Sequence, residues 1–178
     1  MKTNPFHQTV IVTGGATGIG YAVAAQFVER GANVLLNGRT RAKLAGAAEK
    51  LGNSDRVAFI AADITQPANA QTIVDAALER FGRLDVLVNN AGIFYNKPFT
   101  DYTVEDLDAF LGYLRGTFVL TQSAAQAMRQ QPEGSSGLVF GRRRVSARAG
   151  RSGNDFRVRE VNVWRAMLAQ LASGSKCF

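Results

Sequence analysis

Three glycines follow a β-branched run near the start of the chain, at positions where a nucleotide phosphate could bind. Gly14, Gly18 and Gly20 come directly after the run Thr9 to Thr13. Gly14 allows a tight turn, Gly18 lets the backbone approach a pyrophosphate, and Gly20 permits close packing of helix on strand. The helix that begins near Gly18 offers free backbone N–H groups to a phosphate. An ordinary strand-to-helix turn remains the alternative interpretation of the glycines alone.

The end of the second apolar run carries basic residues and no acid. The segment reads Asn37-Gly38-Arg39-Thr40-Arg41, at the distance beyond the glycines where a carboxylate would bind the ribose hydroxyls of NAD. A carboxylate would repel a 2′-phosphate, whereas an arginine fork can bind it through two hydrogen bonds. Arg39 is therefore the candidate for a 2′-phosphate contact, which favours NADP (NADPH) over NAD. Alternatively, Arg39 and Arg41 are solvated charges at a helix start.

Short apolar runs alternate with longer helical patterns through most of the chain. The alternation predicts an α/β fold with parallel strands, right-handed crossovers and helices on both faces of the sheet. In such a fold the carboxyl ends of the strands bring Gly14, Asn37, Asp63 and Asn90 to one edge, where ligands bind. Predicted strands cover 9–13, 33–36, 56–62, 84–88 and 137–140, and predicted helices cover 20–30, 41–51, 68–81, a long segment opened by Thr103, and 156–171.

Composition excludes several classes of protein. A chain of 178 residues with 46% hydrophobic and 20% charged residues is expected to fold as a single domain over residues 1–178. One Cys excludes an internal disulfide, and one His with one Cys cannot build a zinc site, so we expect no metal. The absence of an apolar run of about 18 residues argues against a membrane span. We therefore expect a cytoplasmic location and no membrane partner.

The combination of motifs resembles the classical short-chain dehydrogenase/reductase family. Thr13-Gly14 through Gly18-Ile19-Gly20 is similar to the family's nucleotide loop, and Asn89-Asn90-Ala91-Gly92 is similar to its motif after the fourth strand. Asp63, with Ile64 beside it, matches the acid that the family places by the adenine. The resemblance implies a Rossmann-like doubly wound sheet of five strands in the order 3-2-1-4-5. The implied cofactor-binding residues are Gly14, Thr17, Gly18, Ile19, Gly20, Arg39, Asp63, Ile64, Asn90, Ala91 and Gly92.

The same resemblance implies hydride transfer between NADP(H) and a carbonyl or alcohol, carried out by an Asn, a Ser, a Tyr and a Lys. Alignment places Tyr113 at the Asn position, Arg144 at the Ser position, Arg157 at the Tyr position and Val161 at the Lys position. A guanidinium cannot deliver a proton near neutrality, because its pKa exceeds ~12. We therefore name no catalytic residue and expect the family reaction to be impaired.

The net charge of +7 comes entirely from the last part of the chain. Residues 142–178 contain nine Lys and Arg against two Asp and Glu, whereas residues 1–141 contain twelve of each kind. This basic segment could be an anion-binding patch, an altered pocket, or a degenerate catalytic segment. Within its arginine cluster over 142–165, only Phe156 and Trp164 could stack on bases, so we expect no nucleic-acid partner.

Two further expectations concern the whole chain. Family members continue beyond the last predicted helix with two more strands and a segment over the substrate, so the resemblance implies a C-terminally truncated chain. It also implies a possible homodimer through the long helix from Thr103 and the last helix over 156–171. A non-enzymatic cofactor-binding or interaction protein, with the Arg-rich segment on an anionic partner, is the alternative function.

Overall fold

The structure, a computed structural model, describes residues 8–52, 55–131, 137–140 and 143–146. Helices and strands alternate as predicted, and the boundaries of the first four strands and first three helices lie within two residues of the predicted ones. The predicted helix over 156–171 lies outside the described residues. The elements are β1 (Thr9–Thr13), α1 (Gly18–Glu29), β2 (Asn33–Gly38), α2 (Arg41–Leu51), β3 (Val57–Ala61), α3 (Asn69–Phe81), β4 (Val86–Asn89), the 3-10 turn η2 (Phe99–Asp101), α4 (Val104–Arg129), β5 (Gly137–Phe140) and β6 (Arg143–Ser146).

The strands form one sheet in the order β3-β2-β1-β4-β5-β6. The first five are parallel, which confirms the Rossmann-like order 3-2-1-4-5. The sheet continues with a strand that the sequence did not indicate, because β6 pairs antiparallel with β5 from Gly137 opposite Ser146 to Phe140 opposite Arg143. Residues 143–146, which lie outside every predicted strand and helix, therefore form the strand that covers the β5 edge.

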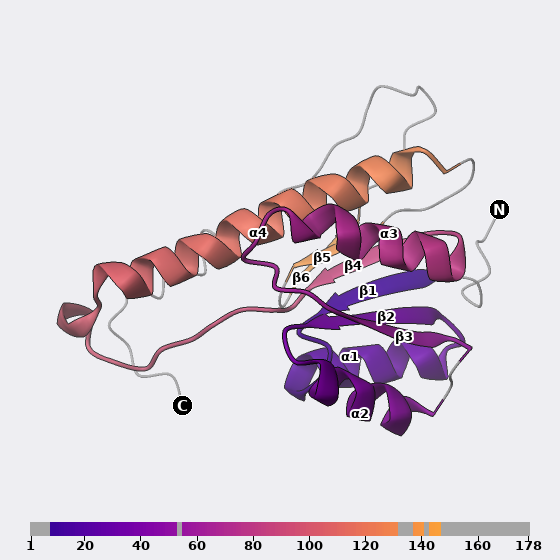
Figure 1. The fold of residues 1–178 in the computed structure, drawn as a ribbon, viewed down its shortest axis with the longest axis horizontal. Coiled ribbons are helices and arrows are strands. Elements are labelled where there is room, and N and C mark those ends of the chain that lie inside the picture. Colours follow the sequence, from indigo (N-terminus) through magenta and orange to yellow (C-terminus); the bar gives the residue numbers. More distant parts are fainter. Residues whose placement is uncertain (1–7, 53–54, 132–136, 141–142, 147–178) are drawn as a thin grey trace.

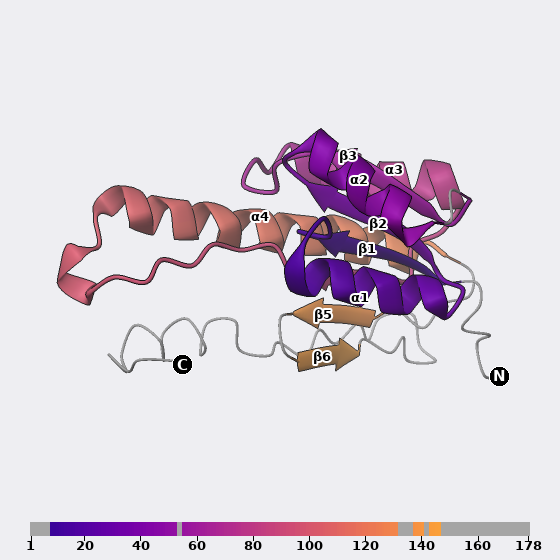
Figure 2. The ribbon, with the colours of Figure 1, turned by 90° about the horizontal axis from the view of Figure 1, so that it is seen from below.

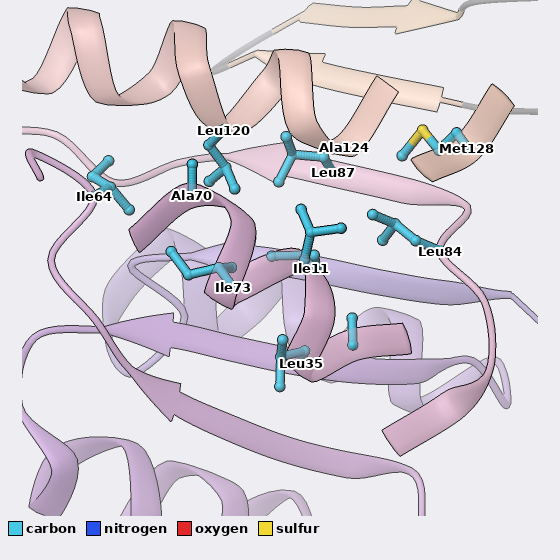
Figure 3. Close-up of a cluster of buried hydrophobic side chains, with 12 residues drawn as sticks. Ile11, Leu35, Ile64, Ala70, Ile73, Leu84, Leu87, Leu120, Ala124 and Met128 are labelled. Carbon is cyan, nitrogen blue, oxygen red and sulfur yellow. The ribbon is translucent and has the colours of Figure 1, made fainter. Parts of the chain in front are cut away.

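Helices cover both faces of this sheet (Figures 1 and 2), with α1 and α2 on one face and α3 and α4 on the other. Alternate side chains of a strand point to opposite faces, so β1 supplies both cores. Val10 and Val12 pack in the core under α1 and α2. Ile11 packs with Ile73 of α3 and Leu120 of α4 in the second core, which Figure 3 shows in close-up. The side chains of Val10, Ile11, Val12 and Ile73 are fully buried.

α4 begins with a capping box at Thr103, the residue that was predicted to open the long helix. The Thr103 side chain accepts a hydrogen bond from the Asp106 backbone N–H, and the Asp106 carboxylate accepts one from the Thr103 N–H at 2.8 Å. Lys97 forms an ion pair with the same carboxylate. The hydrogen bond from Lys97, followed by that from the Thr103 backbone, lowers the pKa of Asp106 below its ordinary value. These contacts join the connection after β4 to the start of α4.

The N-terminal part of α4 extends past the end of the sheet (Figure 1). The 26-residue helix packs on α3 through its C-terminal half, where Leu120, Ala124 and Met128 are buried. None of the helices in the described ranges is both long enough and apolar enough to cross a membrane.

Candidate functional site

A pocket of about 330 Å³ lies at the carboxyl ends of β1, β2, β3 and β4. Parallel strands bring the residues that follow them to this edge, as the sequence predicted. Three predicted residues, Gly18, Ile19 and Gly20, do not line the pocket, and the Ile19 side chain is 74% exposed. Eight predicted residues do line it: Gly14, Thr17, Arg39, Asp63, Ile64, Asn90, Ala91 and Gly92.

Hydrogen bonds between Thr13 and Asn90 join the carboxyl ends of β1 and β4. The Thr13 hydroxyl accepts from the backbone N–H groups of Asn90 and Ala91, each at 3.0 Å, and donates to the Val88 carbonyl at 3.2 Å. The Asn90 side-chain amide donates to the Thr13 carbonyl at 3.0 Å. Thr13 is fully buried and was not among the predicted site residues. The sequence signal that could have identified Thr13 is a hydroxyl side chain at the end of a predicted strand, directly before a glycine.

Gly20 does not line the pocket, but it affects the pocket by allowing α1 to pack closely on Gly14 and Asn90. A Cβ atom at this position would lie 2.3 Å from the Gly14 carbonyl oxygen and 2.6 Å from Nδ2 of Asn90. The start of α1 can therefore approach the β1–α1 turn and Asn90 only because position 20 has no side chain. Gly14 itself has a φ of 65°, in the left-handed region that favours glycine.

The beginning of α1 has the features of a phosphate-binding helix terminus. Thr17 is the N-cap residue, but its side chain makes no capping hydrogen bond, and no acidic residue lies in the first turn. Thr17 and Gly14 both line the pocket. The first backbone N–H groups of a helix have no partner within the helix and carry partial positive charge, so this end of the pocket fits a pyrophosphate.

Partly buried polar contacts stabilise the β3 end of the pocket. Asp63 Oδ1 accepts hydrogen bonds from the backbone N–H and the hydroxyl of Thr65, each at 2.9 Å. The Asn37 side-chain amide donates to the Ala62 carbonyl at 3.0 Å and so ties β2 to the residue before Asp63. Asn37 is fully buried, and its Oδ1 has no hydrogen-bond partner within the described part of the chain.

Among the lining residues that were not predicted, three besides Asn37 have polar side chains. Thr40 and Lys43, from the start of α2, line it beside Arg39, and Tyr113 lines it from α4. Tyr113 reaches this place because α4 packs very closely on the β3–α3 connection. A Cβ atom at Gly116 would lie 1.7 Å from the Ile64 carbonyl oxygen, so only glycine permits this approach.

Of the four positions that align with the family's catalytic residues, two lie within the described residues. Tyr113, at the family's Asn position, lies in the pocket wall. Arg144, at the Ser position, lies in β6 opposite Val139. Arg157 and Val161, at the Tyr and Lys positions, are outside the described residues. Within the described ranges, no three His, Cys, Asp or Glu side chains come together as a metal site requires.

Comparison with known proteins agrees with the fold. The sequence profile of the family described as short chain dehydrogenase matches residues 8–140. An uncharacterized oxidoreductase of Mycobacterium bovis is 37% identical over 129 residues, which cover 72% of this chain and 52% of the relative. An uncharacterized oxidoreductase of Staphylococcus aureus strain USA300 is 34% identical over 128 residues, covering 71% of this chain and 55% of the relative.

Solved structures show the same architecture. A short-chain dehydrogenase/reductase from Brucella melitensis, described as a glucose/ribitol dehydrogenase, superposes with a TM-score of 0.72 at 35% identity, covering 79% of this chain and 58% of that one. A short chain dehydrogenase from Bacillus anthracis gives a TM-score of 0.72 at 26% identity, covering 76% and 57%. The chain spans about half the length of the curated relatives it matches.

Replacing Thr13 by Val tests the connection between β1 and β4. The variant keeps the shape of the side chain but leaves the N–H groups of Asn90 and Ala91 without their acceptor. We expect the free energy of unfolding, measured in urea, to fall by about 1–3 kcal/mol. Thr13→Ser keeps the hydroxyl and serves as the control, with an expected loss of about 0.8 kcal/mol for the methyl group. Equal stability of Thr13→Val and the wild type would contradict the assigned role.

Proposed function

Because the chain belongs to the short-chain dehydrogenase family, whose members bind nicotinamide dinucleotides, we propose that its pocket binds NADP(H). The observation that carries the proposal is the pocket at the carboxyl ends of β1 to β4. It combines the uncapped start of α1 with Asp63 and Asn90, and it has Arg39 rather than an acid at the end of β2. A guanidinium there favours a 2′-phosphate over the bare ribose hydroxyls of NAD.

Each predicted residue has a part in this proposal. Gly14, Thr17 and the backbone that Gly18, Ile19 and Gly20 shape hold the pyrophosphate at the start of α1. Asp63 and Ile64 bind the adenine. Arg39 binds the 2′-phosphate. Asn90, Ala91 and Gly92 form the wall along which the dinucleotide extends from β1 to β4.

We further propose that the family reaction is impaired in this chain. The bound dinucleotide would supply or accept a hydride, but a carbonyl oxygen also needs a proton donor. Tyr113 is the pocket's only ionisable hydroxyl among the described lining residues, and no Lys stands four residues after it in the sequence. A phenol without a neighbouring cation to assist it is a poor proton donor and acceptor at neutral pH.

The proposed homodimer has support on the surface of α4. Val104, Leu107, Leu111 and Phe118 are spaced three, four and seven residues apart, so they lie on one side of the helix. Their side chains are exposed, up to 69% for Val104, although they are large and apolar. An apolar stripe of this kind on a helix is typical of an interface with another chain. A cytoplasmic location stays a prediction from composition.

Cofactor binding is tested by thermal unfolding with NADPH and NADH. A ligand that binds only the folded state raises its stability by about 2.7 kcal/mol at a concentration one hundred times Kd. We expect NADPH to raise the Tm more than NADH does at equal concentration, and Arg39→Gln to remove that difference. The absence of any shift at millimolar NADPH would count against dinucleotide binding, and a larger shift with NADH would count against NADP.

Catalysis is tested by following NADPH absorbance with a panel of aldehydes and ketones. We expect no oxidation of NADPH above that in samples without protein, since no described residue supplies an assisted proton donor. A family member that has the Tyr and Lys serves as the positive control. Turnover that depends on the protein concentration would show the impairment proposal to be wrong.

The dimer is tested by sedimentation velocity of the wild type and of the double variant Leu107→Lys/Leu111→Lys. We expect the wild type to sediment as a dimer and the double variant as a monomer, because two charges then enter the apolar stripe. Glu105→Lys, at an exposed position that is neither three nor four residues from any residue of the stripe, is the control and should stay dimeric. A monomeric wild type over the full concentration range would refute the proposal.

A further inference from the structure

An apolar groove runs along one side of α1, and none of its lining residues also lines the pocket at the strand ends. The side chain of Ile19 is 74% exposed in it, whereas Val23 and Phe27 are half-buried and pack partly against the core under α1 and α2. The lining residues are spaced three and four apart, so they form one stripe of the helix. This α1 groove has a volume of about 330 Å³ and is lined by Ile19, Ala22, Val23, Gln26, Phe27 and Arg30.

The α1 groove is turned toward β4 and the strands beyond it. Gly20, which is seven residues before Phe27 and so on the same side of the helix, lies against Asn90 after β4. The described helices on this face pack on the other half of the sheet, α1 on β1 and β2 and α2 on β2 and β3. Figure 2 shows β5 and β6 on the side of α1 away from α2. A further element alongside α1 would cover that part of the sheet.

The chain after β6 starts from the edge of the sheet where α1 ends. β5 is parallel to β4 and β6 is antiparallel to β5, so Ser146, opposite Gly137, lies at the amino edge of the parallel strands. α1 ends at the same edge, because Arg30 leads into the start of β2. A right-handed crossover from β5 to a parallel strand would keep the next helix on the α4 face, and the antiparallel β6 removes that constraint.

The connection after β6 is long enough to reach the α1 groove. The predicted helix over 156–171 lies outside the described residues, and residues 147–155 separate it from β6. These nine residues, fully extended, span up to about 30 Å. β6 lies three strands from β1, which is about 14 Å at the usual strand spacing. The predicted helix can therefore begin beside the C-terminal end of α1.

The apolar pattern of residues 156–171 complements the α1 groove. A helix over this range would carry one apolar stripe, because its large apolar residues recur at intervals of three or four. The stripe consists of Val158, Val161, Trp164, Leu168 and Leu171. Packing of this stripe against Ile19 and Phe27 would remove apolar surface of both helices from water.

The charges at the end of α1 also match this segment. The last turn of α1 contains Glu29 and no basic residue, and Arg30 follows as the C-cap residue. The last carbonyl groups of a helix carry partial negative charge. Arg157 and Arg159 come at the start of the predicted helix. An antiparallel arrangement of the two helices therefore places these cations beside the negative end of α1.

We propose that the predicted helix over 156–171 packs antiparallel to α1 in the α1 groove and covers the part of the sheet beyond α1. The proposal does not depend on dinucleotide binding. It differs from the family expectation, which places this segment with α4 in a dimer, because β6 brings the chain back to the amino edge before the helix begins.

Fluorescence of Trp164 in the full chain tests this packing, because Trp164 is the only Trp. We expect its emission to be blue-shifted from that of the chain unfolded in urea, and its quenching by acrylamide to be weaker. Ala22→Lys places a charge in the groove at an exposed position and should shift the emission to the red and increase the quenching. Ala45→Lys, the same change at an exposed position of α2 outside the groove, is the matched control and should change neither.

Two fluorescence results would overturn the proposal. Emission of the folded wild type equal to that of the unfolded chain would show that Trp164 lies in water. Blue-shifted emission that Ala22→Lys does not change, or that Ala45→Lys changes equally, would show that Trp164 packs elsewhere. Circular dichroism of each variant establishes that it is folded.

Disulfide formation tests the antiparallel arrangement without adding a charge, in a Cys177→Ser background that removes the native thiol. Gln26→Cys, in the groove, is combined with Val161→Cys on the apolar stripe or with Asn162→Cys outside it. We expect oxidation to join the first pair within one chain and to leave the second pair reduced. No disulfide in either pair, equal oxidation of both pairs, or a disulfide between two chains would each overturn the proposal, and the last result would assign the groove to a second copy.

Discussion

The hydrogen bonds between Thr13 and Asn90 hold the carboxyl ends of β1 and β4 together, and the pocket depends on them. β1 lies at the centre of the sheet with β2 on one side and β4 on the other. The Asn90 amide that binds the Thr13 carbonyl also lies against Gly20 at the start of α1. One pair of side chains therefore sets the positions of the glycine turn, the first helix and the wall after β4, all three of which a phosphate-bearing ligand would contact.

Much of the fold could be predicted because its signals are local. The β-branched run Thr9 to Thr13 is a strand with those bounds, and Thr103 is the N-cap of α4, the long helix that it was predicted to open. β6 could not be predicted in this way. Its sequence, Arg143–Ser146, has no apolar alternation, and the strand exists through its backbone pairing with β5, which no local pattern encodes.

The lining residues of the pocket could be predicted where they follow strands directly. Those that come from helices could be predicted less well. Asp63 and Asn90 follow strands directly, and parallel topology alone brings them to one edge. Lys43 and Tyr113 enter the pocket through the rotation of α2 and the close packing of α4 on Ile64. Those depend on packing between segments far apart in the chain. The basic excess over 142–178 lies mostly outside the described residues, and among the described residues the cations that line the pocket are Arg39 and Lys43.

The long sequence separation between Thr13 and Asn90 also determines the order in which strands can pair during synthesis. The contact closes over 77 residues, whereas β1 pairs with β2 over a much shorter span. A growing chain can therefore pair β1 with β2 and β3 while the other edge of β1 is still unpaired, a state in which apolar strand edges are prone to association. Because Asn90, Gly92 and Tyr113 are all made after β3, a ligand that needs the complete pocket cannot stabilise this early intermediate, and the open edge of β1 stays unpaired until β4 is added.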